Sequence, residues 1–232
     1  MRRVLVTGSN RGLGLEFVRQ LLARGDRVLA ACRSPAEAAE LNALVAAHPG
    51  RAHVHAVEMA NADSVGALAS EAARVFDGLD LLVNNAGMTL RGERFGTVSG
   101  EDMGRALRTN AIGPFLLAQA LAPLLAKGRT PVVANISSQL GSIARTTNFY
   151  SISYAVSKAA LNMASVLLAR GVAAQGICVV AFHPGWVKTD MGGAGAPLAA
   201  ADSVAGLLGV IGRLKPEDSG RFLDHLGQPM PW

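Results

Sequence analysis

Residues 4–14 read Val4-Leu5-Val6-Thr7-Gly8-Ser9-Asn10-Arg11-Gly12-Leu13-Gly14. The apolar, β-branched start of this stretch, bounded by turn residues, predicts a buried strand. Apolar residues then recur at helical spacing from Leu15 to Leu22, and Gly25 ends the helix that they predict. Glycines between a strand and a helix let the backbone approach a pyrophosphate, and the helix N-terminus adds unpaired N–H groups. The stretch therefore predicts a nucleotide-binding unit, with a tight turn that binds nothing as the alternative.

Predicted strands and helices alternate through the rest of the chain. The predicted strands after the first are residues 28–32, 53–57, 79–84, 132–136, 176–182 and 221–223. The predicted helices after the first are residues 35–47, 62–76, 103–125, 155–168 and 201–213. This alternation is typical of a doubly wound α/β fold with a mostly parallel sheet, and a chain of 232 residues suits one domain. We expect a single Rossmann-type domain that spans residues 1–232.

The composition excludes several classes of protein. Half of the residues are hydrophobic and 17% are charged, which excludes a disordered chain and indicates a large core or buried subunit contacts. The net charge of +5 comes from scattered Lys and Arg rather than from a basic block, so neither nucleic acid nor a membrane surface is an expected partner. The longest apolar stretch, Ala111 to Ala126, is interrupted by two prolines and is a poor membrane span. With no recognisable signal before Val4, we expect a soluble cytoplasmic protein.

A tyrosine and a lysine stand four residues apart in Tyr154-Ala155-Val156-Ser157-Lys158. The run from Ala155 to Leu168 is strongly helix-forming, so both side chains leave the same face of a helix. A free phenol titrates near ~10, and a nearby ammonium favours the phenolate and lowers that pKa toward working pH. A general acid is most effective when its pKa lies near ambient pH. Tyr154 with Lys158 is therefore a candidate proton donor, although the spacing alone also occurs by chance.

Three motifs together resemble the short-chain dehydrogenase/reductases over essentially the whole chain. They are T-G-x-x-x-G-x-G at residues 7–14, Asn84-Asn85-Ala86-Gly87, and Tyr154-x-x-x-Lys158, in the family's order. The segment Pro184-Gly185-Trp186-Val187 and the ending from Gly220 to Trp232 are similar to the C-factor-like and sniffer-like carbonyl reductases. The resemblance implies a sheet of about seven strands in the order 3-2-1-4-5-6-7. It also implies NADP(H)-dependent, reversible reduction of a ketone or aldehyde to an alcohol.

The resemblance also assigns the catalytic residues. Ser138 would polarise the reacting carbonyl, with the neighbouring Ser137 as the alternative. Tyr154 would donate the proton, and Lys158 would tune Tyr154 and bind the nicotinamide ribose. Asn110 would support a proton relay through water that reaches Lys158.

The end of the second predicted strand indicates which dinucleotide binds. In dinucleotide folds an acid at this position pairs with the adenosine ribose hydroxyls and repels a 2′-phosphate, whereas arginine attracts the phosphate. This chain has Cys32 and Arg33 there. In the family's geometry Arg11 would add a second cation on the same side of the cofactor. We therefore expect NADP(H) rather than NAD(H).

The family's cofactor contacts carry over onto this sequence with one departure. An aspartate expected just after the third strand is Glu58 here, and its longer side chain could still reach the adenine amino group. The expected cofactor-binding residues are Gly8, Asn10, Arg11, Gly12, Leu13, Gly14, Arg33, Glu58, Met59, Asn85, Ala86, Gly87, Tyr154, Lys158, Pro184, Gly185, Val187 and Thr189. No spacing of residues suggests a metal site.

Apolar residues cover more of two predicted helices than a sheet can bury. The helix at residues 155–168 is apolar almost all round, and the helix at residues 103–125 has a broad apolar stripe. We therefore expect a homodimer or homotetramer that acts on a small carbonyl or alcohol substrate. Two other functions stay open. One is an NADP-binding signalling or regulatory protein with little or no turnover, and the other is a lyase or epimerase that uses its nicotinamide transiently.

Overall fold

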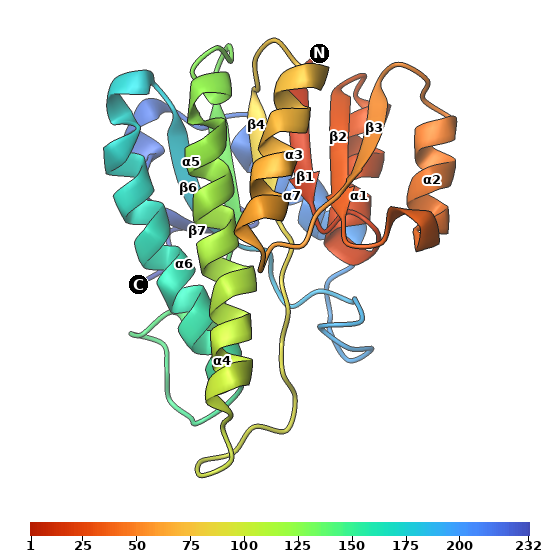
Figure 1. The fold of residues 1–232 in the computed structure, drawn as a ribbon. Helices are drawn as coiled ribbons and strands as arrows, with labels where there is room; N and C mark the ends of the chain where they lie inside the picture. Colours follow the sequence, from red (N-terminus) through yellow and green to blue (C-terminus); the bar gives the residue numbers. More distant parts are fainter.

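The computed structural model describes the whole chain, Met1–Trp232, and contains one sheet of seven strands. Every neighbouring pair is parallel, and the strand order is β3-β2-β1-β4-β5-β6-β7 (Figure 1). The strands are β1 (Arg3–Thr7), β2 (Arg27–Cys32), β3 (Ala52–Ala56), β4 (Leu81–Asn84), β5 (Val132–Ile136), β6 (Cys178–His183) and β7 (Phe222–Asp224). The predicted fold class and strand order are confirmed.

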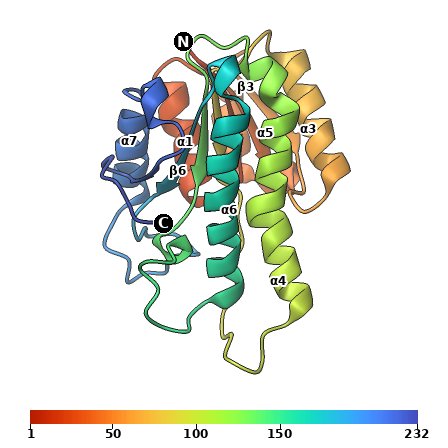
Figure 2. The same cartoon turned by 90° about the vertical axis from the view of Figure 1, so that its left-hand side faces the viewer.

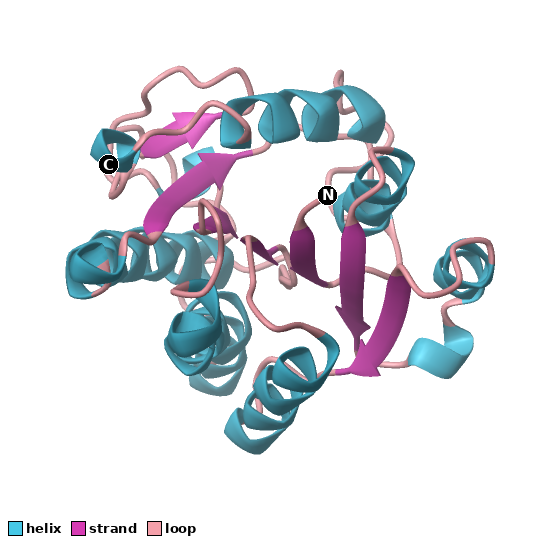
Figure 3. Cartoon of the chain, turned by 90° about the horizontal axis from the view of Figure 1, so that it is seen from above, coloured by secondary structure: helices cyan, strands magenta, loops and turns pink.

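Helices cover both faces of the sheet. They are α1 (Gly12–Ala23), α2 (Ala39–Ala46), α3 (Ala62–Val75), α4 (Gly100–Leu107), α5 (Gly113–Leu125), α6 (Ile152–Gly171) and α7 (Ala200–Ile211). Figure 2 shows the sheet edge-on, with α1 and α7 on one side and α3, α5 and α6 on the other. Seen from above in Figure 3, the strands form a twisted layer between the two sets of helices. The arrangement is the doubly wound one that the alternating elements predict.

Each strand divides its side chains between two cores, because successive side chains point to opposite faces of a sheet. In β1, Val4 and Val6 pack in the core beneath α1 and α7, whereas Leu5 packs in the core beneath α3, α5 and α6. All three side chains are fully buried. Burial on both faces explains why the inner strands are near-continuous apolar runs in the sequence.

The parallel strands all end at one edge of the sheet, which is the lower edge in Figure 1. The loops that follow β4, β5 and β6 extend below this edge, together with α4. β1 lies between β2 and β4, so the order of the strands reverses beside it. Ligands of open α/β sheets bind outside the carboxyl ends of the strands at such a reversal.

Two predicted helices are interrupted. Residues 35–47 form a 3₁₀ turn (Pro35–Glu37) and α2 instead of one helix, because Ala38 between them has a ψ of 65°, outside the helical region. Residues 103–125 form the end of α4, a π-helical turn (Arg108–Ile112) and α5 instead of one regular helix. Gly113 donates its N–H to the carbonyl of Arg108, five residues back. Pro114 has no N–H and therefore cannot donate the α-helical bond to the carbonyl of Asn110, four residues back. The irregularity, which the sequence pattern did not predict, is centred on a residue expected to be catalytic, and such turns are frequent at functional sites.

One helix, α6, is long and apolar enough to cross a membrane by length and composition alone. The core helix of a soluble protein passes the same test. Four uncharged polar residues of α6 are buried in the fold beside Lys158, namely Ser153, Ser157, Asn162 and Ser165. Each of these side chains hydrogen-bonds to another part of the chain, so α6 packs as a helix of this fold. Its exposed apolar side chains are Val156, Met163 and Leu167.

Candidate active site

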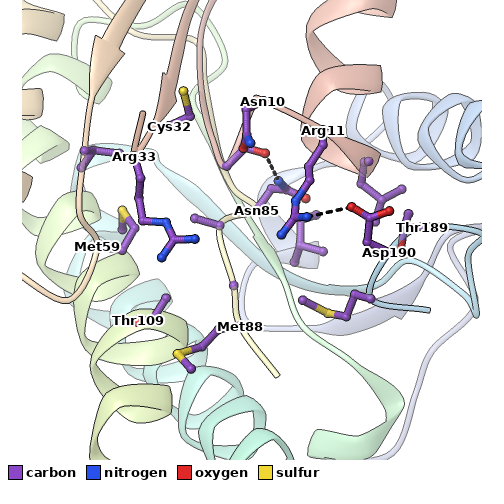
Figure 4. A pocket seen from close by; sticks show the side chains of 18 of the residues that line it. Asn10, Arg11, Cys32, Arg33, Met59, Asn85, Met88, Thr109, Thr189 and Asp190 are labelled. Carbon is purple, nitrogen blue, oxygen red and sulfur yellow. Dashed lines mark hydrogen bonds and ion pairs between the residues drawn. The ribbon is translucent and has the colours of Figure 1, made fainter. Parts of the chain in front are cut away.

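A cavity of about 790 Å³ lies at the carboxyl edge of the sheet (Figure 4). The predicted cofactor residues that line it are Gly8, Asn10, Arg11, Gly12, Leu13, Arg33, Glu58, Met59, Asn85, Ala86, Gly87, Tyr154, Lys158, Pro184 and Thr189. Three predicted cofactor residues, Gly14, Gly185 and Val187, do not line it. Of the two remaining predicted catalytic residues, neither Asn110 nor Ser138 is part of the lining. The fold thus brings residues from Gly8 to Met191 to one cavity.

Close packing explains the glycines of the first turn. A Cβ atom on Gly14 would lie 2.0 Å from the carbonyl oxygen of Gly8, and Gly8 itself has a φ of +68°. Only glycine fits at both positions, because a side chain at residue 14 would push α1 away from β1. Arg11, the residue before α1, makes no capping hydrogen bond with its side chain. The N-terminus of α1 is therefore available to an anion in the cavity.

The motif after β4 is tied to the first turn. The side-chain amide of Asn85 donates to the carbonyls of Thr7 at 2.9 Å and Gly8 at 3.2 Å. The Thr7 hydroxyl accepts from the backbone N–H groups of Asn85 and Ala86. Asn84 points instead into the core, where its amide donates to Asn135 Oδ1 at 2.8 Å. The motif therefore holds two strand ends together while Asn85, Ala86 and Gly87 line the cavity.

Two predicted arginines line the cavity, Arg33 after β2 and Arg11 before α1, but only one of them has an ion-pair partner. The Arg11 guanidinium lies 2.7 Å from the Asp190 carboxylate, and Arg33 makes no ion pair (Figure 4). Both arginine side chains are exposed to solvent. Cys32 is buried beside Arg33, and burial raises the pKa of its thiol. Neither Cys32 nor Arg33 is acidic, and the first carboxylate after β2 that lines the cavity is that of Glu37.

Glu58, which stands where the family has an aspartate, makes hydrogen bonds within its own turn. One carboxylate oxygen accepts from the backbone N–H of Ala60 at 3.0 Å, and the Glu58 N–H donates to the Ser64 hydroxyl at 2.9 Å. Met59 follows, and a Cβ on Gly113 would lie 2.2 Å from its carbonyl oxygen. This turn therefore packs directly against the start of α5, and Glu58 and Met59 form one wall of the cavity.

Lys158 projects from α6 toward the end of β5. Its ammonium donates to the carbonyl of Ile136 at 2.7 Å and lies 5.6 Å from the centre of the Tyr154 ring. Burial lowers the pKa of Lys158 to about 8. The residue is therefore mostly charged at neutral pH, and a modest rise in pH removes the charge.

The pKa of Tyr154 is raised, not lowered. Burial raises it to about 12, and a hydrogen bond with Ser138 opposes the rise. Our prediction that Lys158 lowers this pKa is wrong for this structure, because burial has the larger effect and the ammonium does not contact the phenol oxygen. Tyr154 is thus a neutral phenol at neutral pH, which is the form that donates a proton.

The two serines after β5 have different surroundings. The Ser137 hydroxyl donates to Asn162 Oδ1 at 2.6 Å, so its proton is engaged in the interior. The Ser138 hydroxyl accepts from the N–H of Leu140 at 3.1 Å, and its interaction with the Tyr154 phenol opposes the rise in the pKa of that phenol. Ser138 therefore lies beside the phenol, as expected for the residue that shares a substrate oxygen with it. His183 accepts at Nδ1 from the N–H of Gln139, the next residue, at 3.3 Å.

Asn110 is buried in the π-helical turn and is fully hydrogen-bonded. Its amide oxygen accepts from the N–H of Met88 at 2.8 Å, and its amide nitrogen donates to the Met88 carbonyl and to the Ser157 hydroxyl. A Cβ on Gly87 would lie 3.4 Å from the Asn110 oxygen and 3.7 Å from the Lys158 ammonium. The side chain of Asn110 therefore anchors the start of the loop after β4 close to Lys158.

Several cavity residues were not predicted from the sequence. They are Cys32, Ser34, Glu37, Val57, Ala60, Met88, Arg105, Thr109, Ile136, Asp190 and Met191, whereas Ser137, the alternative catalytic serine, was named and also lines the cavity. Ser34 directly follows Arg33. A hydroxyl next to the arginine predicted to bind a phosphate could have indicated that Ser34 lines the cavity. Arg105 and Thr109 come from α4 and the π-helical turn, and no pattern in the sequence places them near the end of β3.

Comparisons with known proteins agree with one another. The family model described as short chain dehydrogenase matches residues 2–196. The C-signal of Myxococcus xanthus is 44% identical over 154 residues, which cover 66% of this chain and 93% of that protein. The NADPH-bound carbonyl reductase from chicken fatty liver is 39% identical and superimposes with a TM-score of 0.94 over 100% of this chain and 99% of that one. The carbonyl reductase Sniffer of D. melanogaster is 35% identical, with a TM-score of 0.95 over 100% of both chains.

Proposed function

The chain belongs to the short-chain dehydrogenase/reductase family, and from that membership we propose that it reduces a ketone or aldehyde to an alcohol with NADPH. It is an NADP-dependent oxidoreductase of the carbonyl reductase type. One observation carries the proposal: Tyr154 and Lys158 lie near the end of β5 with Ser138 beside the phenol, and the cavity that Tyr154 and Lys158 line reaches Arg33 at the end of β2. β2 and β5 are separated by three strand steps, or roughly 14 Å at ~4.8 Å each, which suits an extended dinucleotide.

The residues of the cavity fit NADP(H). The glycine turn and the uncapped N-terminus of α1 suit the pyrophosphate. Arg33, with no ion-pair partner and no neighbouring acid at the end of β2, suits the 2′-phosphate. Lys158 and Tyr154 would hold the nicotinamide ribose. Pro184 and Thr189 line the same cavity. When bound, the cofactor supplies the hydride.

The protein's own groups then supply the proton and the charge. Ser138 polarises the carbonyl of the substrate by donating a hydrogen bond to its oxygen, and Tyr154 donates the proton to the same oxygen. Lys158 holds a positive charge 5.6 Å from the centre of the Tyr154 ring and stabilises the phenolate that the transfer leaves behind. Asn110 keeps the loop after β4 in place beside Lys158 and supports reprotonation through water. In the oxidative direction Tyr154 is the base.

Net consumption of NADPH tests the function directly. Purified protein is mixed with NADPH and a panel of ketones and aldehydes, and NADPH absorbance is followed together with alcohol formation. We expect one alcohol formed for each NADPH oxidised with at least one carbonyl class. Binding of NADPH without consumption would favour a signalling or regulatory protein. Turnover of a substrate without net NADPH loss would favour a lyase or epimerase.

The chain is also proposed to work as one cytoplasmic domain, residues 1–232, in a homodimer or homotetramer. Support for the oligomer comes from exposed apolar side chains on the π-helical turn and α6, namely Ile112, Val156, Met163 and Leu167. Because the other side of α6 already packs on its own fold, these exposed side chains are available to contact a second copy of the chain. The proposal includes no contact with nucleic acid or with a membrane.

A further inference from the structure

The helix that carries Tyr154 lacks a local cap. Ser151, the residue before α6, has a φ of +48° and is the only residue other than glycine with a positive φ. Its side chain makes no capping hydrogen bond. Serine at this position normally accepts from an N–H of the first helical turn. The first turn of α6, which includes Tyr154, therefore depends on another part of the chain.

A carboxylate from the loop between β4 and α4 supplies that cap. One oxygen of Glu93 accepts from the N–H of Ser153 at 3.1 Å, and the other accepts from the Ser153 hydroxyl. Ser153 is fully buried, and Glu93 is partly buried. A negative charge at the N-terminus of a helix also interacts favourably with the positive end of the helix dipole. Glu93 thus caps the N-terminus of α6, which the side chain of Ser151 does not.

The same loop is fixed at its start as well. Met88 is held by two hydrogen bonds to the side chain of Asn110, five residues before Glu93. Between the two anchors, the Thr89 and Ser151 hydroxyls lie 3.4 Å apart. The loop therefore connects the π-helical turn to the first turn of α6, and both segments hold residues of the proposed reaction.

We propose that Glu93 is a positioning residue that fixes the first turn of α6 and thereby places the Tyr154 hydroxyl beside Ser138. This inference rests on the proposed function, because placing a phenol matters only if the phenol transfers a proton. Tyr154 directly follows Ser153, so loss of the cap frays the turn that carries the phenol. Small displacements of a proton donor reduce turnover strongly while leaving binding of the other reactant intact.

Three single variants distinguish a positioning role of Glu93 from general damage to the fold. Glu93→Ala removes the cap, and Glu93→Gln keeps an oxygen that accepts from the Ser153 N–H. Glu101→Ala is the matched control, because Glu101 is an exposed acid at the start of α4 that makes no hydrogen bond with its side chain. We expect kcat to fall about tenfold in Glu93→Ala, to recover largely in Glu93→Gln, and to stay at the wild-type value in Glu101→Ala. The Kd for NADPH should change less than kcat in Glu93→Ala and stay within about twofold of wild type in the other two variants.

A readout that does not depend on turnover accompanies the kinetics. Hydrogen exchange of the peptide that spans residues 151–158 should be faster in Glu93→Ala than in wild type and close to wild type in Glu93→Gln. Ser153→Ala should reduce kcat by less than Glu93→Ala, and the double variant should lose less than the two single losses multiplied. The inference is wrong if Glu93→Ala keeps the wild-type exchange or kcat, or if it also weakens NADPH binding to the same extent. Absence of NADPH oxidation by wild-type protein would instead count against the proposed function.

Discussion

The Arg11 guanidinium lies 2.7 Å from the Asp190 carboxylate, across the mouth of the cofactor cavity. Arg91 donates to the carbonyl of the same aspartate at 2.9 Å, so the glycine turn and the loops after β4 and β6 meet at one residue. The Arg11 and Asp190 side chains are 67% and 73% exposed, and an exposed pair of this kind contributes little to stability. The pair matters instead for cofactor binding. Of the two arginines predicted to bind the 2′-phosphate, Arg11 is already paired with a carboxylate and Arg33 is not.

Arg33 should therefore dominate the preference for NADP(H). Arg33→Ala should weaken NADPH binding by roughly 1–3 kcal/mol, or about 5- to 150-fold in Kd, and leave NADH binding nearly unchanged. Arg11→Ala should have a smaller effect, since Arg11 must first leave Asp190. Titration of both cofactors by calorimetry measures this, with Asp190→Asn as the variant that releases Arg11. Equal affinity of the wild type for NADH and NADPH would contradict the prediction, as would an unchanged Kd in Arg33→Ala.

Tyr154→Phe removes the proton donor and keeps the ring. Turnover should fall by roughly 10² or more, which is the usual contribution of general acid catalysis, and NADPH binding should change little. Stopped-flow measurement of NADPH oxidation at saturating carbonyl gives the rate, and titration gives the Kd. Tyr150→Phe is the matched control, because Tyr150 is the other tyrosine of the chain and is 68% exposed. Full turnover by Tyr154→Phe would favour the non-catalytic alternative.

NADPH binding should weaken as the pH rises through about 8. Burial lowers the pKa of Lys158 to about 8, so the ammonium is present below that pH and lost above it. The phosphates of the cofactor keep their charge over this range, because their pKa lies near ~6. The Kd for NADPH should rise between pH about 7 and about 9.5 in the wild type and stay flat in Lys158→Met. A flat wild-type profile would show that the ammonium does not contribute to binding.

The fold was predictable because each signal in the sequence is local. The run Val4-Leu5-Val6, the glycines that follow and the apolar repeat from Leu15 to Leu22 each act on their immediate neighbours, and together they gave β1, the turn and α1. Tyr154 and Lys158 lie on one helix, so their meeting at the cavity needed only the helical repeat. The π-helical turn was missed because Pro114 acts on a carbonyl four residues away inside an otherwise regular pattern.

What the sequence did not predict depends on long-range contacts. Arg11 and Asp190 are 179 residues apart, and Glu93 and Ser153 are 60 apart. The raised pKa of Tyr154 follows from burial, which no spacing of residues reports. The hydrogen bond of Ser137 with Asn162 likewise needed the fold, since Ser137 and Ser138 are adjacent in the sequence and only their surroundings distinguish them.

Asp80 should make the fold sensitive to acid. Although burial of Asp80 alone would raise its pKa, hydrogen bonds from the Arg3 guanidinium and from the N–H groups of Arg129 and Arg3 hold that pKa at about 2. A depressed folded-state pKa gives stability that is present above the unfolded value near ~3.9 and lost as pH falls toward about 2.

Asp80→Asn should lower the free energy of unfolding by about 2 kcal/mol at pH 7 and flatten its acid dependence. Urea denaturation at several pH values measures both quantities. Asp77→Asn is the control, because Asp77 also pairs with Arg3 but its side chain is 88% exposed, so its effect should be small. Equal stability of the wild type and Asp80→Asn across the acid range would show that Arg3 and Asp80 do not stabilise the fold.

A homo-oligomer should form through the outer face of α6 and the π-helical turn. Met163 is 61% exposed, Leu167 is 55% exposed and Ile112 is 48% exposed, and nothing in the chain covers them. Because Asn110 and Tyr154 belong to the same segments, a partner that packs there would also hold the site rigid. Met163→Glu with Leu167→Glu should therefore yield a monomer of about 24 kDa with lower kcat, seen by sedimentation and NADPH oxidation. Leu226→Glu, an equally exposed leucine after β7, should leave both mass and kcat unchanged. A wild-type monomer with full activity would mean that these side chains remain in water and that the site needs no partner.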